Sequence, residues 1–145
     1  MTSYVSAALR RFVGQRANYV CEYCLIHERD TYFGCQVEHI ISEKHGGPTN
    51  EDNLAYACTY CNRAEGTDIG AFAASTGEVT RFFNPRVDRW TDHFSLNGVI
   101  IESQTAIGEA TAKILRFNDD DRLFERQTLE SVGRYPPGEA IELLN

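Results

Sequence analysis

Two Cys-x-x-Cys pairs constrain this chain more than any other feature of its sequence. The first pair is Cys21 and Cys24, and the second is Cys58 and Cys61. This spacing lets two thiolates converge on one ion, and two such pairs together are typical of a tetrahedral zinc site. The N-terminus shows no secretory signal, so a reducing cytoplasm is expected, where disulfides are disfavoured. The sequence therefore predicts a structural Zn²⁺ on the four cysteines.

The pairs leave two alternatives open, a thioredoxin-like redox dithiol and four buried thiols. A second pair makes the redox interpretation the weaker one. The fifth cysteine, Cys35, is expected to be a small core residue. The 33 residues between Cys24 and Cys58 exceed the about 15–20 of a plain zinc ribbon. This insert is therefore where we expect the chemistry.

Length, composition and net charge exclude several classes of protein. A chain of 145 residues suits one domain, predicted as 1–145, and 42% hydrophobic with 24% charged residues excludes wholesale disorder. No apolar run approaches the about 20 residues of a membrane span, so no membrane partner is expected. The net charge is 14 − 21 = −7, which excludes a passive nucleic-acid coat but not a local phosphate site.

Local patterns predict the elements around the cysteines. Residues 6–16 have the apolar stripe of a short amphipathic helix. Residues 31–42 are rich in β-branched and aromatic types and are predicted as a hairpin, followed by a loop over 43–53. Residues 54–57 are predicted as a short apolar turn, and Asn62 is expected to open a helical stretch.

Further along, the sequence predicts a strand over 77–83 and a hairpin turn at Asn97-Gly98, where Asn-Gly favours a type I′ turn. A helix is expected over 105–117, and Asn118 or Asp119 is expected to cap another that runs through Leu129. The chain is thus divided into a zinc and catalytic core of about 18–70, a C-terminal extension of about 77–133 and a loose tail, 134–145.

The insert and the second cysteine pair contain an ordered set of motifs: Glu38-His39-Ile40-Ile41, Gly46-Gly47, Asn53-Leu54 and Cys61-Asn62. This set resembles the HNH endonuclease family, and is most similar to bacterial HNH proteins with a Glu-His-Ile-Ile motif and a four-cysteine zinc site. The similarity extends through Phe83-Asn84-Pro85 towards Asn118. The resemblance implies a small α+β fold, a zinc-stapled ββα-metal (treble-clef-like) core with a C-terminal hairpin and helices.

The resemblance also implies roles for individual residues. His39 matches the general base, Glu38 and Asn62 match the ligands of a catalytic Mg²⁺ or Mn²⁺, and Asn53 matches the residue that holds the loop beside the base. DNA is the implied substrate, cut to leave a 5′-phosphate and a 3′-hydroxyl. An imidazole with an ordinary pKa of about 6.5 suits proton transfer near neutral pH, and amide and carboxylate oxygens suit a hard cation.

Strand geometry restricts this assignment, because adjacent residues point to opposite faces. Glu38 and His39 can border one site only near a bend or at a strand end. Three further residues near the motif, Lys44, His45 and Arg63, are candidates for contacts with phosphates. Cleavage of both strands would favour a homodimer.

The chain departs from the family pattern at two positions. Glu65 stands where the family usually has Lys, and Ser42 stands where it usually has Pro. A carboxylate at position 65 is expected to repel phosphate and to make DNA binding weak or sensitive to salt. The alternative function is a zinc module that binds nucleic acid or protein without catalysis.

Overall fold

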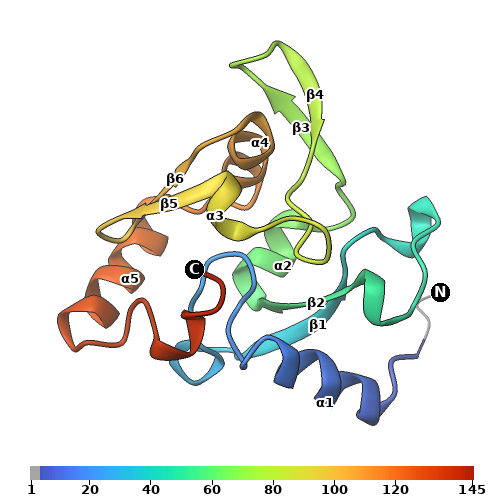
Figure 1. Ribbon diagram of the computed structural model, residues 1–145, viewed down its shortest axis with the longest axis horizontal. Helices are drawn as coiled ribbons and strands as arrows, with labels where there is room; N and C mark the ends of the chain where they lie inside the picture. The colour runs from blue at the N-terminus through green and yellow to red at the C-terminus, as the bar shows by residue number, and fades with distance from the viewer. Residues whose placement is uncertain (1–3) are drawn as a thin grey trace.

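A two-stranded antiparallel ladder lies at the centre of the computed structural model, which describes residues 4–145. Strand β1 (Cys35–His39) pairs with β2 (Leu54–Cys58), with Cys35 opposite Cys58 at one end and His39 opposite Leu54 at the other. Every residue of β2 is buried. Helices cover the ladder on both sides, α1 (Ala7–Arg16) below and α2 (Thr59–Glu65) above in Figure 1. The two knuckles of the cysteine pairs lie at the end of this ladder where Cys58 stands.

Helix α1 confirms the helix predicted over 6–16. The Ser6 hydroxyl accepts a hydrogen bond from the Leu9 backbone N–H at 3.1 Å and so caps the helix. Val13 is fully buried and packs with Leu54 and Tyr56 of β2. This contact anchors the helix on the underside of the ladder.

The predicted hairpin over 31–42 and the predicted turn over 54–57 are wrong. The segment 31–42 contributes only β1, and its partner is the segment taken for a turn. Gly34, with φ +74, turns the chain into β1 instead of reversing it between two strands. The pattern of β-branched residues located a strand but could not show that its partner follows after a long loop.

Helix α2 begins at Thr59, so the expectation that Asn62 opens the helix is also wrong. The Cys58 thiol accepts from the Cys61 N–H at 3.4 Å and occupies the cap position. Asn62 consequently lies within the first turns of the helix. The order β1, β2, α2 with a cysteine pair at the helix start confirms the predicted α+β, treble-clef-like core.

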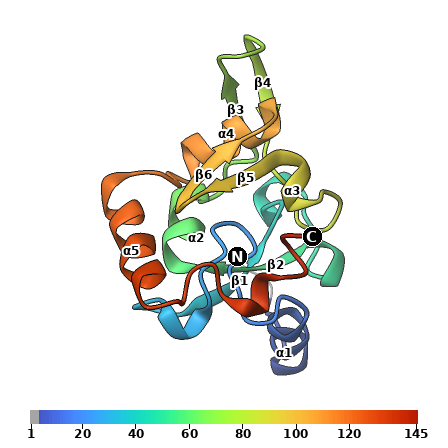
Figure 2. The same ribbon diagram turned by 60° about the vertical axis from the view of Figure 1, so that its left-hand side comes forward.

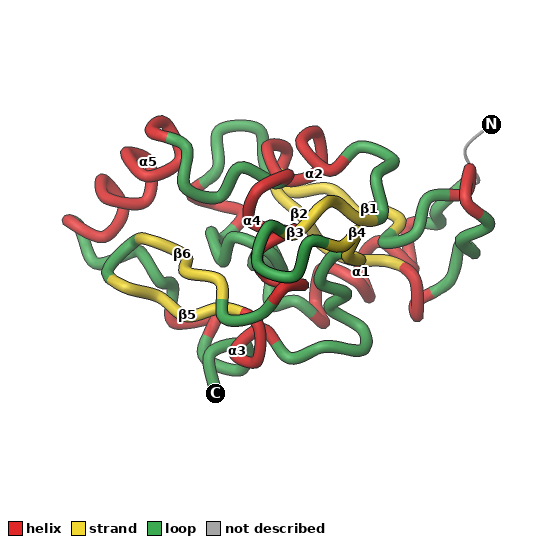
Figure 3. The backbone as a smooth tube through the Cα atoms, turned by 90° about the horizontal axis from the view of Figure 1, so that it is seen from above, coloured by secondary structure: helices red, strands yellow, loops and turns green. Residues whose placement is uncertain are grey.

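The extension after this core forms two more hairpins and three helices. Their bounds are β3 (Gly70–Ala73), β4 (Glu78–Arg81), α3 (Trp90–His93), β5 (Phe94–Asn97), β6 (Ile100–Ser103), α4 (Ala106–Ile114) and α5 (Asp120–Ser131). Figure 2 shows the β3–β4 hairpin projecting from the body. From above, β5–β6 and α5 lie at one end of the molecule and β1–β2 towards the other (Figure 3).

Several predictions hold in this extension. The strand over 77–83 appears as β4, a tight turn joins β5 to β6, and both helices are present, with Asp119 at the N-cap position of α5 but without a side-chain cap hydrogen bond. The turn is not the predicted type I′, because Asn97 pairs with Ile100 and, of the two central residues Gly98 and Val99, only Gly98 has a positive φ, +62. The partner of β4 was missed, since β3 has the small residues Gly70 and Ala71 where a strand pattern needs larger ones.

The predicted loose tail, 134–145, is packed against the molecule. Tyr135 and Ala140 are buried, and the Tyr135 hydroxyl donates to the Cys24 carbonyl at 2.8 Å. Glu139 pairs with Arg29, whose Nη1 lies 2.5 Å from its carboxylate. In Figure 1 the red C-terminal segment runs beside the blue segment of the first knuckle. The Pro-Pro-Gly sequence led to a prediction of looseness, whereas the buried tyrosine holds the segment in place.

The largest buried cluster joins both halves of the chain. It contains the four cysteines together with aromatic residues of the extension, Phe83, Trp90, Phe94, Phe117 and Tyr135. Among the described residues no helix is both long and apolar enough to cross a membrane. The remaining turns are 3₁₀ segments at Glu28–Asp30, Glu43–His45, Glu51–Asn53 and Gly138–Ala140.

Candidate metal centre and active site

The four paired cysteines form one cluster, as their spacing predicts. Their sulfur atoms all lie within 4.8 Å of one another, and all four residues are buried. The Cys24 and Cys58 sulfurs are 3.7 Å apart. Four sulfurs at about 2.3 Å from a tetrahedral zinc ion stand about 3.8 Å from one another. The cluster therefore fits a structural zinc ion, and two separate redox dithiols would not need to converge in this way.

A buried arginine from the extension contacts this cluster. Arg122 of α5 is only 3% exposed, and its Nη2 lies 3.7 Å from the Cys58 sulfur and 3.9 Å from that of Cys61. Burial by itself opposes the charge on Arg122, but the thiolates of Cys24, Cys61 and Cys58 raise its pKa above the ordinary value. The guanidinium thus offsets part of the negative charge of a four-thiolate site. Sequence reasoning missed it, since 61 residues separate it from Cys61.

Further contacts tie the first knuckle to the extension. The Trp90 indole N–H donates to the Tyr23 carbonyl at 2.9 Å. Glu22 forms a buried ion pair with Arg86, whose Nη1 also donates to the Leu54 carbonyl at 3.0 Å. These contacts hold the two residues between Cys21 and Cys24, and Trp90 and Arg86, which make them, lie outside the motif.

Three of the four predicted catalytic residues line one cavity. It has a volume of about 690 Å³ and lies between the end of β1 and the open side of α2. Glu38, His39 and Asn62 all border it, as does Lys44. His45 is exposed and does not line it, and Arg63 lines a second cavity across α2. The structure thus brings the proposed base and the proposed cation ligands to one place.

His39 is the last residue of β1, so the restriction from strand geometry is met. Its side chain is 13% exposed, and its Nε2 lies 2.8 Å from the Thr49 hydroxyl oxygen. The Glu43 carboxylate is 3.6 Å from the same nitrogen. The sequence analysis singled out neither neighbour, although Glu43 is only four residues away. Two acceptors near Nε2 fix the orientation of the ring.

Asn53 is buried and does not face the cavity. Its amide oxygen accepts from the Ile41 N–H at 3.0 Å, and its amide nitrogen donates to the Ile41 and Pro48 carbonyls at 2.9 Å each. Gly47 lies in the same loop, where a Cβ would come within 1.7 Å of the Ile41 carbonyl oxygen. Asn53 and Gly47 therefore keep the loop that contains Thr49 close against the end of β1.

Glu38 is buried, and its Oε1 has no hydrogen-bond partner among the described residues. Burial raises the pKa of Glu38 to about 8, against the opposing effect of the neighbouring Tyr23 hydroxyl. That hydroxyl is likewise buried without a partner within residues 4–145. A buried carboxylate oxygen that borders a polar cavity and lacks a donor is suited to a cation.

Glu65 differs from what the sequence predicted for it. Its side chain is buried, 3% exposed, and burial followed by repulsion from Glu38 raises its pKa to about 10. It does not line the cavity that holds His39. The predicted repulsion of a substrate phosphate therefore does not follow, because this carboxyl is buried and neutral near pH 7. The charged group with which Glu65 interacts most strongly is the Glu38 carboxylate.

Asn62 is half-buried at the cavity wall. Its amide nitrogen donates to the Gln36 amide oxygen at 2.5 Å. Within the part of the chain that the structure describes, nothing donates to the amide oxygen of Asn62. This arrangement leaves the oxygen, the atom a hard cation would use, available towards the cavity.

Comparison with known proteins supports the resemblance. Residues 21–68 match the family model described as HNH endonuclease, so this segment is an HNH domain. The match spans both cysteine pairs and every predicted catalytic residue, and it ends before the extension. Neither the curated proteins nor the solved structures contain a match to the chain.

Proposed function

We propose that this protein is a metal-dependent endonuclease that hydrolyses phosphodiester bonds of DNA in the cavity beside α2. The main support is that this one cavity brings together Glu38, His39 and Asn62, within a segment that matches the HNH endonuclease model. HNH domains are typical of endonucleases, and the reaction type follows from that family.

His39 would act as the general base. With Nε2 protonated and donating towards Thr49, the lone pair is on Nδ1, which has no hydrogen bond within the described residues. Nδ1 would take the proton from the attacking water, and the imidazolium would be stabilised by the Glu43 carboxylate 3.6 Å from Nε2. The reaction would leave a 5′-phosphate and a 3′-hydroxyl.

Glu38 and Asn62 would hold the catalytic cation, Mg²⁺ or Mn²⁺, through one oxygen each. When bound, such an ion supplies positive charge to the scissile phosphate and the leaving oxygen. Two protein oxygens suffice, because Mg²⁺ keeps several of its waters. The cysteine cluster holds Cys58 and Cys61 at the start of α2 and so positions Asn62, the next residue in the helix. Lys44 would contribute a phosphate contact at the cavity rim.

The test is conversion of supercoiled plasmid to nicked or linear DNA in Mg²⁺, Mn²⁺ or no divalent ion. His39→Ala should lower the rate at least about 100-fold, because a positioned base contributes that much or more. It should leave the zinc content unchanged. His45→Ala is the matched control, since His45 is exposed outside the cavity, and it should cleave like wild type.

Equal cleavage by the His39→Ala and wild-type proteins, each freed of host nucleases, would contradict the assignment. Retained zinc with no cleavage in any metal would support the non-catalytic zinc module instead.

A further inference from the structure

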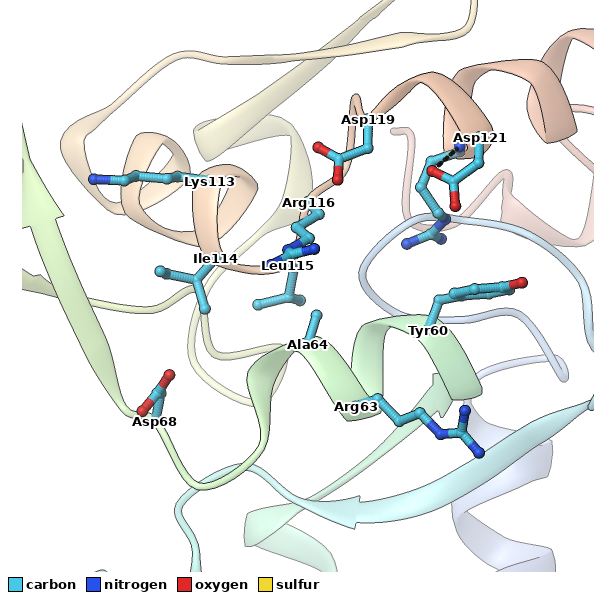
Figure 4. A pocket seen from close by; sticks show the side chains of 11 residues that line it. Tyr60, Arg63, Ala64, Asp68, Lys113, Ile114, Leu115, Arg116, Asp119 and Asp121 are labelled. Carbon is cyan, nitrogen blue, oxygen red and sulfur yellow. Dashed lines mark hydrogen bonds between the residues drawn. The ribbon is translucent and has the colours of Figure 1, made fainter.

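A second cavity lies across α2 from the proposed active site. It has a volume of about 650 Å³ and lies between α2, the end of α4 and the start of α5. Figure 4 shows Arg116 and Asp119 above α2, Tyr60 at the upper side of this helix, and Arg63 extending from its lower side, away from Arg116. This volume is within the about 300–1,000 Å³ typical of small-molecule and nucleotide sites.

Unpaired cations gather around this cavity. Arg63, Lys113 and Arg116 line it, and none of their side chains forms a hydrogen bond or ion pair within residues 4–145. In contrast, Arg81 pairs with Asp88 and Arg134 with Asp30. Because three carboxylates line the same cavity, these cations favour a ligand that has both anionic groups and hydrogen-bond donors.

Arg116 supports this interpretation independently. It directly follows Leu115, the C-cap of α4, and its backbone has φ +55. This position after a helix favours glycine, because a Cβ in the left-handed region costs free energy. An arginine that accepts this strain and whose side chain forms no hydrogen bond or ion pair within the described residues has a reason to be there other than folding.

Tyr60 supplies a stacking surface at the same place. Tyr60 is 45% exposed, and the Arg122 guanidinium lies over its ring at 5.2 Å from the centroid, so a base would stack on the part of the ring that Arg122 does not cover. A base can stack on an exposed aromatic ring whatever its sequence, and arginines beside the ring can hold the flanking phosphates. The carboxylates of Asp68, Asp119 and Asp121, which also line the cavity, would repel phosphate but can accept from the amino groups of a base.

The position of the cavity relates it to the active site. Arg63 is adjacent in sequence to Asn62, which faces the other cavity. A strand that crosses α2 would therefore pass from one cavity to the other. Because a paired base cannot enter a hollow while it stays stacked in a duplex, the occupant is a nucleotide of an unpaired strand.

We propose that this second cavity binds one nucleotide of single-stranded DNA next to the scissile phosphate, with its base on Tyr60 and its phosphates on Arg63 and Arg116. The proposal rests on the proposed function, since that function makes DNA the substrate. It assigns to the extension, through Arg116 and Lys113, a part in substrate recognition.

Binding would be measured by fluorescence anisotropy with a labelled single-stranded oligonucleotide and with its duplex, in the zinc-loaded His39→Ala protein so that the probe stays intact. Tyr60→Leu should weaken single-strand binding about 5- to 150-fold, the range for loss of one base–aromatic stack. Tyr60→Phe, which keeps the aromatic ring, should bind the single strand about as tightly as the protein with Tyr60. Duplex binding should change much less in both.

Arg116→Gly separates recognition from folding, because glycine suits φ +55. It should unfold no more easily than wild type yet bind the single strand more weakly, with the slope of log K against log salt reduced by about 0.7 for the lost phosphate. The matched control is Arg10→Gln with Arg11→Gln, since these exposed arginines lie on α1, far along the chain from the cavity. The control should keep the wild-type slope.

Unchanged single-strand binding in Tyr60→Leu and Arg116→Gly, or an equal loss in the α1 control, would overturn the inference. If wild type cleaves plasmid while these variants bind normally, the inference fails and the proposed function stands. If wild type cleaves nothing while the predicted binding losses appear, the proposed function fails and the nucleotide site stands.

Discussion

The HNH domain, 21–68, and the extension that follows it contribute to the molecule in opposite ways. The first contains the cysteine cluster and every group in the proposed reaction. The second lies outside the matched segment, yet Arg122, Trp90 and Tyr135 from it contact residues of the two knuckles. The packing around the cysteine pairs is thus completed by residues that belong to no sequence motif identified in this chain.

The physical reason is size. A segment as short as the HNH domain buries too little surface to be stable without a metal or additional packing. Here the largest buried cluster includes the four cysteines, which could hold a zinc ion, and five aromatic residues from the chain after residue 68. A zinc ion on these cysteines and the packing of the later residues would therefore stabilise the same core.

Loss of the zinc should have the largest effect. Cys58→Ser, or a strong chelator, removes a ligand set that contributes about 10–16 kcal/mol of apparent binding free energy in small zinc domains. We expect the variant or the chelated protein to lose its cooperative thermal unfolding transition. Circular dichroism during heating measures this. Cys35→Ser is the control, because Cys35 lies outside the cluster, and it should keep both zinc and cooperativity. A cooperative transition in Cys58→Ser would show that the extension alone stabilises the core.

Truncation of Trp90, which attaches the extension to the first knuckle, should have the second largest effect on stability. Trp90 is buried and donates to the Tyr23 carbonyl, so Trp90→Ala should lower the free energy of unfolding by about 3–5 kcal/mol. Urea denaturation measures it. If the loss stays below about 1 kcal/mol, the extension packs beside the HNH domain without stabilising it.

Arg122 tests the electrostatic side of the comparison. Arg122→Met keeps much of the side-chain volume but removes the charge near Cys58 and Cys61. Zinc affinity should fall about 10- to 100-fold, as for other residues that contact metal ligands. Competition with a chromophoric chelator measures it. Arg122→Lys should recover part of the affinity, and an unchanged affinity in Arg122→Met would assign Arg122 to packing alone.

The smallest effect is expected within the HNH domain, at Glu65. Near pH 4 this carboxyl is protonated in the folded chain, where its pKa is about 10, and largely protonated in the unfolded chain, where its pKa is 4.5. Glu65→Gln should therefore change the unfolding free energy at that pH by less than about 1 kcal/mol.

The two proteins should diverge as pH rises. The folded state keeps a proton that the unfolded state releases above its ordinary pKa of 4.5. Wild-type stability therefore falls with pH up to about 10, by at most about 1.4 kcal/mol per unit for this group. Urea titrations at several pH values, with zinc but no other divalent ion, should give a flatter dependence for Glu65→Gln. Parallel curves would contradict the raised pKa.

The sequence by itself determined the cysteine cluster and the HNH core, together with α1, the Asn97-Gly98 turn and the helices after it. These features depend on spacing, capping and turn residues that act over a few positions. The sequence also placed Glu38 and His39 correctly in a strand. Because adjacent strand residues point to opposite faces, it further required the strand to bend or end at these two residues if both border one site.

Only the tertiary structure decided which strand pairs with β1, that Glu65 is buried, and that 134–145 packs on the first knuckle. It also decided that Arg122 lies against the cysteine sulfurs and that unpaired cations surround a second cavity. These outcomes depend on contacts between residues tens of positions apart. Such contacts are selected by burial and by the closure of the whole chain, and local pattern does not encode them.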